Sequence, residues 1–468
     1  MAAEYKTPGV YIEEIPKLPP SIASVETAIP AFIGYTAKAQ LKEENDLLNK
    51  PRRINSMLEY EQYFGGPQLE TSIQVTIDTT QSNKIDVQGK VLNPGKYLMY
   101  YSLQMFFIKG GGDCYIVSIG DYTGGGVIDL TTLTGGLTEV SKINEVTLIL
   151  FPDAVNMTSA GNYYALHKEA IDQAEDLKDR FVVMDIWTNP ADPAFDAIQT
   201  FRDFDFGEIE KRKYAAAYYP RIYTRLDYQY DDSGNNVTIV GKGDASLSGT
   251  LAELKGKNNA FYFMAKGAIT DIEMLMPASS AVVGKYAEVD DTRGVWKAPA
   301  NVGIDYAVRP EIVVSHNDQK NLNVDVVSGK SINVIRSFPG RGPALIWGAR
   351  TLAGNDNEWR YISVRRFFNM VEESTKNATE QFVFEPNDRN TWIRVKSMIE
   401  NYLTQQWKAG ALMGTTTREA YFVKVGLNET MTELDIWEGR MIVEIGMAVV
   451  RPAEFIILRF MHKMLQES

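Results

Sequence analysis

The stretch EVTLILF at residues 145–151 decides the fold, because it opens a repeated alternation of apolar strands and amphipathic helices. The segments that follow are a helix near residues 159–179, the strand RFVVMDIW at 180–187, a helix near 195–203 and the strand KYAAAYY at 213–219. Ser159 suits the N-cap of the first helix. Because the strands are apolar on both faces, they predict a parallel sheet covered by helices on two sides, with right-handed crossovers.

Polar insertions flank this α/β layer, and the chain changes character after it. Residues 224–257, polar around DDSGNN, are expected to be a surface hairpin or insertion, and residues 66–96 a second insertion, both without a recognisable motif. Beyond residue 300 the pattern predicts an α+β unit. Its expected elements are the strands INVIRSF (332–338) and PALIWGART (343–351), helices near 361–377 and 389–407, and the closing strands YFVKVGL (421–427), RMIVEIGMAVV (440–450) and EFIILRF (454–460).

Both ends of the chain carry strands that lack a nearby partner. TPGVYIEEIPKLPP at residues 7–20 favours extended structure through apolar residues such as Val10 and Ile12, and its prolines exclude a helix. A lone strand leaves its N–H and C=O groups unpaired, and even an isolated hairpin is marginal in water. EFIILRF at the other end is a second strand of this kind. We therefore expect residues 7–20 to join a sheet elsewhere.

Composition indicates an ordinary globular chain and excludes several partner classes. The 468 residues are 44% apolar, enough for about three domains of ordinary size. With 60 Asp and Glu against 48 Lys and Arg, the net charge of −12 argues against nucleic acid as the main partner. The chain contains no run of about 18 apolar residues that could span a bilayer, so no membrane insertion is expected. The beginning, MAAEYKTPG, lacks the apolar core of a secretory signal, so the product is expected to start out in the cytosol.

The sequence carries little sign of catalytic, nucleotide or metal chemistry. SGKS at residues 328–331 resembles the end of a phosphate-binding loop, but Val324 stands where that loop needs a glycine. The three histidines, His167, His316 and His462, accompany neither a GxSxG elbow nor an HExxH motif. His316, within VVSHND, is the best candidate base and leaves a hydrolase as the alternative function. We otherwise expect no catalytic residue, no metal site and no cofactor.

The only cysteine, Cys114, excludes an intrachain disulfide and a four-cysteine zinc site. We expect it to be a core residue, because a lone cysteine among apolar neighbours usually packs as a small hydrophobic side chain.

Several phrases together carry a family likeness. They are TPGVYIEEI with AFIGYT, YFGG, FFIKGGGDCYIVSIG, DDTRGVWKAPAN, INVIRSFPGRGPALIWGARTL, EWRYISVRRFFNMVEES, FEPNDRNTWIRV and VEIGMAVVRPAEFIILRF. The sequence resembles the contractile tail sheath proteins of phage tails, of R-type bacteriocins and, in its compact size, of extracellular contractile injection systems. The resemblance is strongest over about residues 290–460, moderate over the first 40 residues and residues 105–120, and absent from the two insertions.

The resemblance implies a multidomain α+β and α/β architecture. In such proteins an inner α+β sheath core domain is formed by both chain ends, and an outer α/β domain, subtilisin-like in fold but non-catalytic, is inserted between them. The corresponding expected boundaries are an N-terminal arm at residues 1–26, the outer domain at 27–310, a C-terminal core domain at 311–453 and a C-terminal strand arm at 454–468. Periodicity alone does not predict the insertion of one domain into another.

The resemblance also implies a mechanical function. Subunits of such sheaths polymerise helically, in stacked hexameric rings, around an inner tube, and contraction drives the tube through a target cell envelope without a nucleotide. The implied partners are further copies of the chain, the inner tube protein, and baseplate and terminal cap proteins. The implied place of assembly is the bacterial cytoplasm, before the particle forms part of a phage tail or is released.

The resemblance and the two unpaired strands together predict roles for particular residues. Inter-subunit strand arms are expected at Val10, Tyr11, Ile12, Glu13, Ile15, Phe455, Ile456, Ile457 and Leu458, and host strands at Ile442, Val443, Glu444 and Ile445. An added strand binds chiefly through backbone hydrogen bonds. Arg394, Lys396 and Lys408 are expected to meet carboxylates of the inner tube, with an ordinary solvated helix surface as the alternative.

Overall fold

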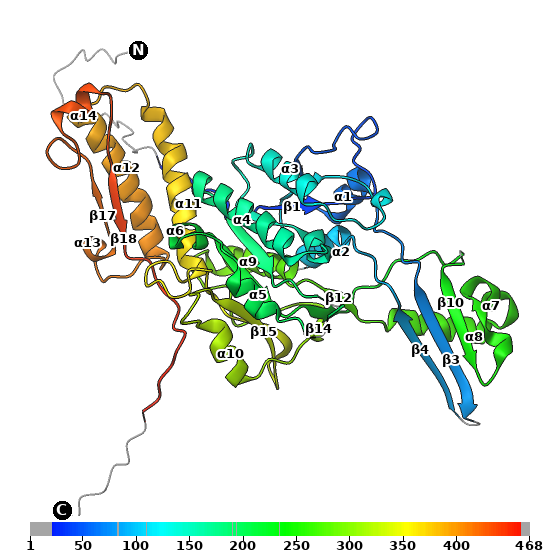
Figure 1. Ribbon diagram of the computed structural model, residues 1–468. Helices are drawn as coiled ribbons and strands as arrows, with labels where there is room; N and C mark the ends of the chain where they lie inside the picture. The colour runs from blue at the N-terminus through cyan, green and yellow to red at the C-terminus, as the bar shows by residue number, and fades with distance from the viewer. Residues whose placement is uncertain are drawn as a thin grey trace, which may run out of the picture. The chain divides into compact units, whose positions relative to one another are not determined.

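The computed structural model describes residues 21–459, apart from residues 82–83, 109, 190, 193 and 234 (Figure 1). The described residues form two compact units, a large one of residues 26–372 with 451–459 and a small one of residues 21–25 with 373–450. The small unit therefore takes its residues from two parts of the sequence that lie on either side of the large unit's main segment.

A nine-stranded sheet forms the centre of the large unit, in the order β13-β16-β15-β8-β7-β6-β1-β5-β2. The strands are β1 (Pro30–Gly34), β2 (Arg52–Ile54), β5 (Cys114–Ser118), β6 (Leu148–Leu150), β7 (Phe181–Asp185), β8 (Ala215–Tyr219), β13 (Val302–Gly303), β15 (Ile332–Phe338) and β16 (Gly342–Trp347). The strands from β15 to β5 pair in parallel, while β2, β16 and β13 add antiparallel strands at the sides.

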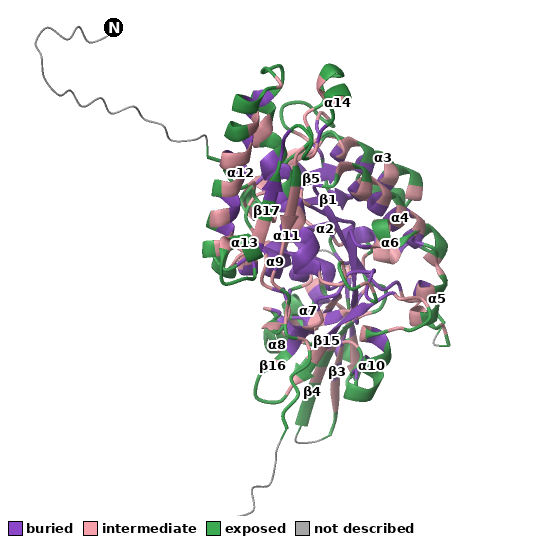
Figure 2. Cartoon of the chain, turned by 90° about the vertical axis from the view of Figure 1, so that its left-hand side faces the viewer, coloured by how far each residue is buried: buried purple, intermediate pink, exposed green. Residues whose placement is uncertain are grey.

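Alternate residues of the central strands face two separate cores, which is why these strands are apolar throughout. In β6, Ile149 packs into the core on one face, while Leu148 and Leu150 pack into the core on the other. The covering helices are α3 (Leu130–Val140) and α4 (Ala160–Leu177) on the first face, and α2 (Met99–Phe107) and α9 (Ser279–Arg293) on the second. Figure 2 shows buried residues along the strands and exposed ones on the outward sides of the helices.

The α/β alternation predicted from residues 145–219 is confirmed. β6, β7 and β8 are parallel neighbours. The Ser159 hydroxyl accepts a hydrogen bond from the backbone N–H of Asn162 (3.4 Å) and so caps α4. Cys114 is fully buried in β5, as expected. The shorter helices of this unit are α1 (Met57–Phe64), α5 (Ala197–Asp203), α6 (Ile209–Arg212) and α10 (His316–Asn323).

The two polar segments predicted as separate insertions meet in one small sheet, ordered β11-β10-β3-β4. Its elements are β3 (Ile73–Gln81), β4 (Lys84–Val91), β10 (Val237–Lys242) and β11 (Gly249–Thr250), with the helices α7 (Leu251–Lys257) and α8 (Asn259–Thr270). β3 pairs in parallel with β10, so the two segments form one substructure. β4 lies at its edge with Lys84, Asp86 and Lys90 exposed. A third sheet comprises β9 (Ile222–Thr224), β12 (Met274–Met276) and β14 (Ala307–Pro310).

The small unit is built on helices and a two-stranded antiparallel sheet. Its elements are the second part of α11 (Ile362–Thr379), α12 (Arg389–Lys408), α13 (Thr417–Ala420), β17 (Tyr421–Lys424), α14 (Glu433–Trp437) and β18 (Glu444–Met447). Helices were predicted near both long ones, and α12 buries Val395, Ile399 and Leu403 on one face. None of the helices in the described residues is long and apolar enough to cross a membrane.

Some sequence-based expectations differ from the structure. The expected boundary at residue 311 does not coincide with the division into units, because β15 pairs with β8 and so brings residues 332–347 into the large sheet. EFIILRF forms no strand over residues 454–459, since no edge of the sheets in this single chain pairs with it. The segment at residues 7–20 lies outside the described residues.

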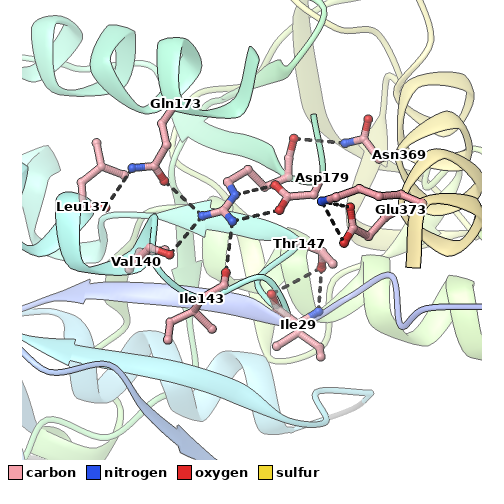
Figure 3. Close-up of polar contacts among 11 residues, drawn as sticks. Ile29, Leu137, Val140, Ile143, Thr147, Gln173, Asp179, Asn369 and Glu373 are labelled. Carbon is pink, nitrogen blue, oxygen red and sulfur yellow. Dashed lines mark hydrogen bonds and ion pairs between the residues drawn. The ribbon is translucent and has the colours of Figure 1, made fainter. Parts of the chain in front are cut away.

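A buried arginine ties the start of β7 to its surroundings (Figure 3). The Arg180 side chain has no exposed surface and pairs with Asp179 at 2.6 Å from Nε to Oδ1. It also donates to the carbonyl oxygens of Val140 and Ile143, each at 3.1 Å. The Asn369 amide of α11 donates to the carbonyl of Arg180 at 3.1 Å. The guanidinium therefore supplies hydrogen-bond donors to carbonyls at the C-terminal end of α3 and just beyond it.

Candidate assembly surfaces

The histidines form no catalytic arrangement in the described part of the chain. His167 is buried in α4 with Nδ1 2.8 Å from the carbonyl oxygen of Tyr163, and burial lowers its pKa to about 4. His316 is exposed at the start of α10 and makes no hydrogen bond to a described nucleophile or carboxylate. Among the same residues, no cluster of three or more potential metal ligands occurs. His462 lies outside the described residues.

The carboxylates at the ends of two central strands cap helices. Asp153, after β6, accepts hydrogen bonds from three backbone N–H groups at 2.5–3.1 Å, one of them that of Met99 in α2. Asp185, at the end of β7, accepts from the N–H of Ser279 in α9 at 3.1 Å. Burial raises the pKa of Asp153 to about 7 and that of Asp185 to about 6. The sheet edge where α/β proteins place ligands thus holds helix caps here.

Lys330 of the SGKS segment holds surface loops together. It is buried, and its ammonium donates to the backbone carbonyls of Arg202 and Phe204. Arg212 donates to the carbonyl of Ser328 at 2.8 Å. A hollow of about 640 Å³ beside these residues mixes the same cations with Asp and Glu side chains. Because the cations already bind main-chain oxygens, their main effect is to fix the loop that ends in SGKS.

The two-stranded sheet of the small unit leaves its outer edges open in the described part of the chain. β17 and β18 pair from Tyr421 opposite Met447 to Lys424 opposite Glu444, and no other described strand joins them. One face is covered by α12, where the Tyr421 hydroxyl donates to the carbonyl of Glu400 at 3.1 Å. Two strands of four residues are marginal by themselves, so these edges are suited to receive further strands.

The predicted host residues lie at or just before β18. Glu444 and Ile445 belong to the strand, whereas Ile442 and Val443 precede it. The backbone N–H of Ala448 donates to the carbonyl of Ala420, which places its polar groups toward β17. Since neighbouring residues of a strand point their N–H and C=O groups to opposite sides, Ile445 and Met447 present theirs at the open edge. These two residues are therefore the better candidates for pairing with an added strand.

Four consecutive apolar side chains stand exposed near the C-terminal end of the described residues. Phe455, Ile456, Ile457 and Leu458 are each 70–80% exposed. Full burial of such a side chain contributes about 1.5–3 kcal/mol, so covering these four side chains with a partner would add stabilisation that the single chain lacks. The segment therefore presents an apolar surface that is suited to burial against a partner.

The residue before this segment is fixed to the large unit. The Glu454 carboxylate pairs with the guanidinium of buried Arg350 at 2.5 Å from Oε2 to Nη2, and it accepts from the amide of Asn323 at 2.7 Å. Burial raises the pKa of Glu454, but the hydrogen bonds from Arg350 and Asn323 outweigh that effect and leave it lowered. Sequence reasoning missed Arg350, because 104 residues separate it from Glu454 and no motif links them.

The predicted tube-contacting cations do not form one cluster. Arg394 and Lys408 are exposed on the same face of α12, about 21 Å apart along the helix axis. Arg394 also lies 3.5 Å from Glu385 in an exposed ion pair. Lys396 is half-buried and lies about 200° around the helix from Arg394, so it does not share that face. Of the three, only Arg394 and Lys408 could contact one partner surface along this helix.

Exposed aromatic residues in the small unit were not predicted. Phe384 is fully exposed and has a φ of 69°, a left-handed conformation that is uncommon for a bulky residue. Trp437, at the end of α14, is 79% exposed. The loops that carry them are joined by a hydrogen bond from Asn387 to the carbonyl of Arg440 at 3.0 Å. Neither aromatic residue belongs to an amphipathic repeat, so periodicity gave no signal for them.

Comparison with known proteins gives consistent matches. Residues 354–462 match the family described as the phage tail sheath C-terminal domain. The tail sheath protein of Burkholderia phage BcepMu is 29% identical over 150 residues, which make up 31% of this chain and 31% of that protein. The chain spans about a quarter to a half of the length of the curated tail sheath relatives it matches.

Two solved structures match nearly the whole chain. A chain in the baseplate of the anti-feeding prophage is 30% identical, with a TM-score of 0.62 over 98% of this chain and 100% of that one. The sheath complex of the extracellular contractile injection system PVC, in its contracted state, is 28% identical, with a TM-score of 0.64 over 98% of this chain and 99% of that one. The similarity therefore extends over residues of both units.

Proposed function

The chain belongs to the family of contractile tail sheath proteins, and we propose that it polymerises around an inner tube and contracts to drive that tube through a target cell envelope. It is a structural sheath subunit and not an enzyme, and its relatives give the hydrolase alternative no support. The observation that carries the proposal is that the described residues include both open strand edges, at β17 and β18, and an exposed apolar segment, Phe455–Leu458.

In this proposal each subunit supplies the strands that another lacks. The segment Phe455–Leu458 adds to the small-unit sheet of one neighbour, and the arm at Val10–Ile15 adds to that of another, so that the two open edges receive two arms. Such an interface is heterologous, because donor and acceptor surfaces differ, and it generates an open helical polymer instead of a closed dimer. Backbone pairing keeps the chains linked, while the proline-rich PKLPP lets neighbouring subunits shift during contraction.

The two units serve as inner and outer domains of the sheath. The small unit, from residues 21–25 and 373–450, is the inner core domain, and the large unit is the outer domain, with a subtilisin-like but non-catalytic fold. What supports this assignment is that the small unit draws on sequence from both sides of the large unit and that the large unit has a parallel α/β sheet. The strand-end carboxylates Asp153 and Asp185 act as helix caps there.

The partners follow from the same proposal. Copies of the chain form stacked hexameric rings, the face of α12 with Arg394 and Lys408 grips the inner tube, and baseplate and terminal cap proteins close the ends. Assembly takes place in the bacterial cytoplasm, before the particle becomes a phage tail or is released. The support is that similar solved chains belong to a baseplate and to a contracted sheath complex.

Charge substitutions in the exposed segment test this function. F455D with I457D should leave the monomer's melting temperature unchanged, because both side chains are exposed in the single chain, and should abolish long tubes in electron micrographs. A matched control is I85D, which also places an acid at an exposed apolar position, but in β4 of the four-stranded sheet. This variant should form normal tubes. Tubes of normal length from the double variant would refute strand donation by this segment.

A further inference from the structure

We infer that Glu454, held by Arg350, is a positioning residue for sheath assembly. It fixes the point at which the C-terminal segment leaves the large unit and so presets Phe455–Leu458 for addition to a neighbouring subunit. This inference rests on the proposed function, since it concerns how the donated segment is presented.

The root of the segment is held at two points. Arg451 donates from Nη1 to the carbonyl oxygen of Asn357 at 2.8 Å, and three residues later Glu454 binds Arg350. Pro452 lies between these anchors, fixes its own φ and restricts Arg451 to extended conformations. The chain from Arg451 to Glu454 therefore has little conformational freedom, although it belongs to no helix or strand.

Both carboxylate oxygens of Glu454 accept hydrogen bonds from several residues. Oε1 of Glu454 accepts from Nε of Arg350 at 2.9 Å and from Asn323 at 2.7 Å, while Oε2 accepts from Nη2 of Arg350 at 2.5 Å and from the Tyr361 hydroxyl at 3.3 Å. The remaining Arg350 donor group, Nη1, binds the carbonyl of Gly354 at 3.0 Å. Bidentate, charge-assisted geometry of this kind fixes direction as well as position.

Directly beyond this anchor the exposed apolar run begins. Phe455 to Leu458 follow without a spacer, so in extended conformation Leu458 can lie no more than about 14 Å from Glu454. The receiving edge of a neighbour must come within that distance. Because the root is already ordered, docking does not have to immobilise it, and assembly proceeds at a lower subunit concentration than with a free tail.

The first test uses E454Q, which keeps the shape of the side chain and removes its charge. We expect the monomer to stay folded at the assay temperature, although its melting temperature falls because buried Arg350 loses its charged partner, and the critical concentration for tube formation to rise about tenfold. The matched control is E433Q, an exposed glutamate of α14 outside the site, which should assemble like the wild type. A wild-type critical concentration for E454Q would overturn the inference, as would an effect that arises from unfolding of the monomer at the assay temperature.

The second test moves the apolar run away from an intact anchor. Insertion of Gly-Ser-Gly-Ser between Glu454 and Phe455 should raise the critical concentration to a similar extent, and combining it with E454Q should add little. A merely structural role of Glu454 predicts instead that the insertion is harmless. If F455D with I457D blocks tubes while E454Q and the insertion do not, strand donation stands and the positioning role fails. If F455D with I457D still forms tubes, strand donation by this segment fails, and the positioning role fails with it.

Discussion

The phenyl ring of Phe422 on β17 lies across the backbone of Gly446 on β18, its directly paired residue, so closely that a Cβ atom at Gly446 would come 2.2 Å from ring carbon Cε1. The Phe422 side chain remains about half exposed, at 49%. The ring thus covers a glycine on one face of the sheet, while α12 covers the opposite face.

Replacing Gly446 with alanine should displace this ring into solvent and lower the free energy of unfolding of the small unit by about 1 kcal/mol. Urea denaturation of the monomer measures the change. As a control, the single variant F422A is compared with the double variant F422A/G446A. Their free energies of unfolding should differ little, because neither has a ring that the alanine could displace. An equal effect of G446A with and without the ring would show that the contact is unimportant.

Replacing Arg180 with methionine should destabilise the large unit by about 3–5 kcal/mol, because it leaves the buried Asp179 carboxylate without its cation. K142M, which breaks an exposed ion pair with Glu139, should change stability by at most about 1 kcal/mol. Both values come from denaturant unfolding curves. Similar losses for the two variants would contradict the importance assigned to burial.

Asp153 should make stability fall as the pH rises. Its folded-state pKa of about 7 exceeds its ordinary value of 3.8, so the folded chain holds this proton more tightly than the unfolded chain between those values. The free energy of unfolding then decreases from about pH 4 to pH 7, by up to about 1.4 kcal/mol per pH unit from this group. The advantage of the wild type over D153N, measured in urea, should shrink across this range. A constant difference would be inconsistent with a raised pKa.

Reversing Arg394 and Lys408 to glutamate should weaken assembly on inner tubes without changing monomer melting. Exposed ion pairs contribute only about 0–1 kcal/mol each, so the effect should be moderate and larger at low salt. Lys396 provides the matched control, since K396Q removes a cation from a different side of the same helix. Co-assembly in sedimentation assays reports the outcome, and equal behaviour of all variants would leave α12 as a solvated surface.

Replacing Ile12 with proline should spare the folded monomer and prevent polymerisation. The substitution removes one backbone donor and excludes a central position in a strand ladder. Calorimetry of the monomer and electron microscopy of assembly mixtures test the two halves of this prediction. Substantial destabilisation of the monomer, with tubes still forming, would mean that the segment belongs to its own subunit's sheet.

Local patterns predicted the elements that have a strong chemical signature. β6, β7 and β8 were predictable because both of their faces are apolar: consecutive residues such as Leu148 and Ile149 each pack into a core, on opposite faces of the sheet. α4 was predictable because Ser159 caps it. Partners distant in sequence were not predictable. The parallel pairing of β3 with β10 joins two polar segments, and strand propensity alone does not reveal which strands pair.

The candidate assembly surfaces divide in the same way. Phe455–Leu458 could be identified from an apolar run at a chain end, because the composition of the run is its signal. Arg350 could not be identified, because the sequence does not show whether an arginine is buried. Its role also depends on a contact with Glu454, which is 104 residues away in the sequence.

The charged rim of β4 also bears on the fidelity of assembly. A protein that joins its copies by adding strands to open edges must avoid joining them at the wrong edge. β4 is an edge strand of eight residues, longer than β17 or β18, yet Lys84, Asp86 and Lys90 stand exposed along it. Charges on an edge discourage an apolar strand from docking there. If copies of the chain join at the open edges of β17 and β18, as proposed, the charged β4 edge keeps added strands to the small-unit sheet and protects the polymer from branching.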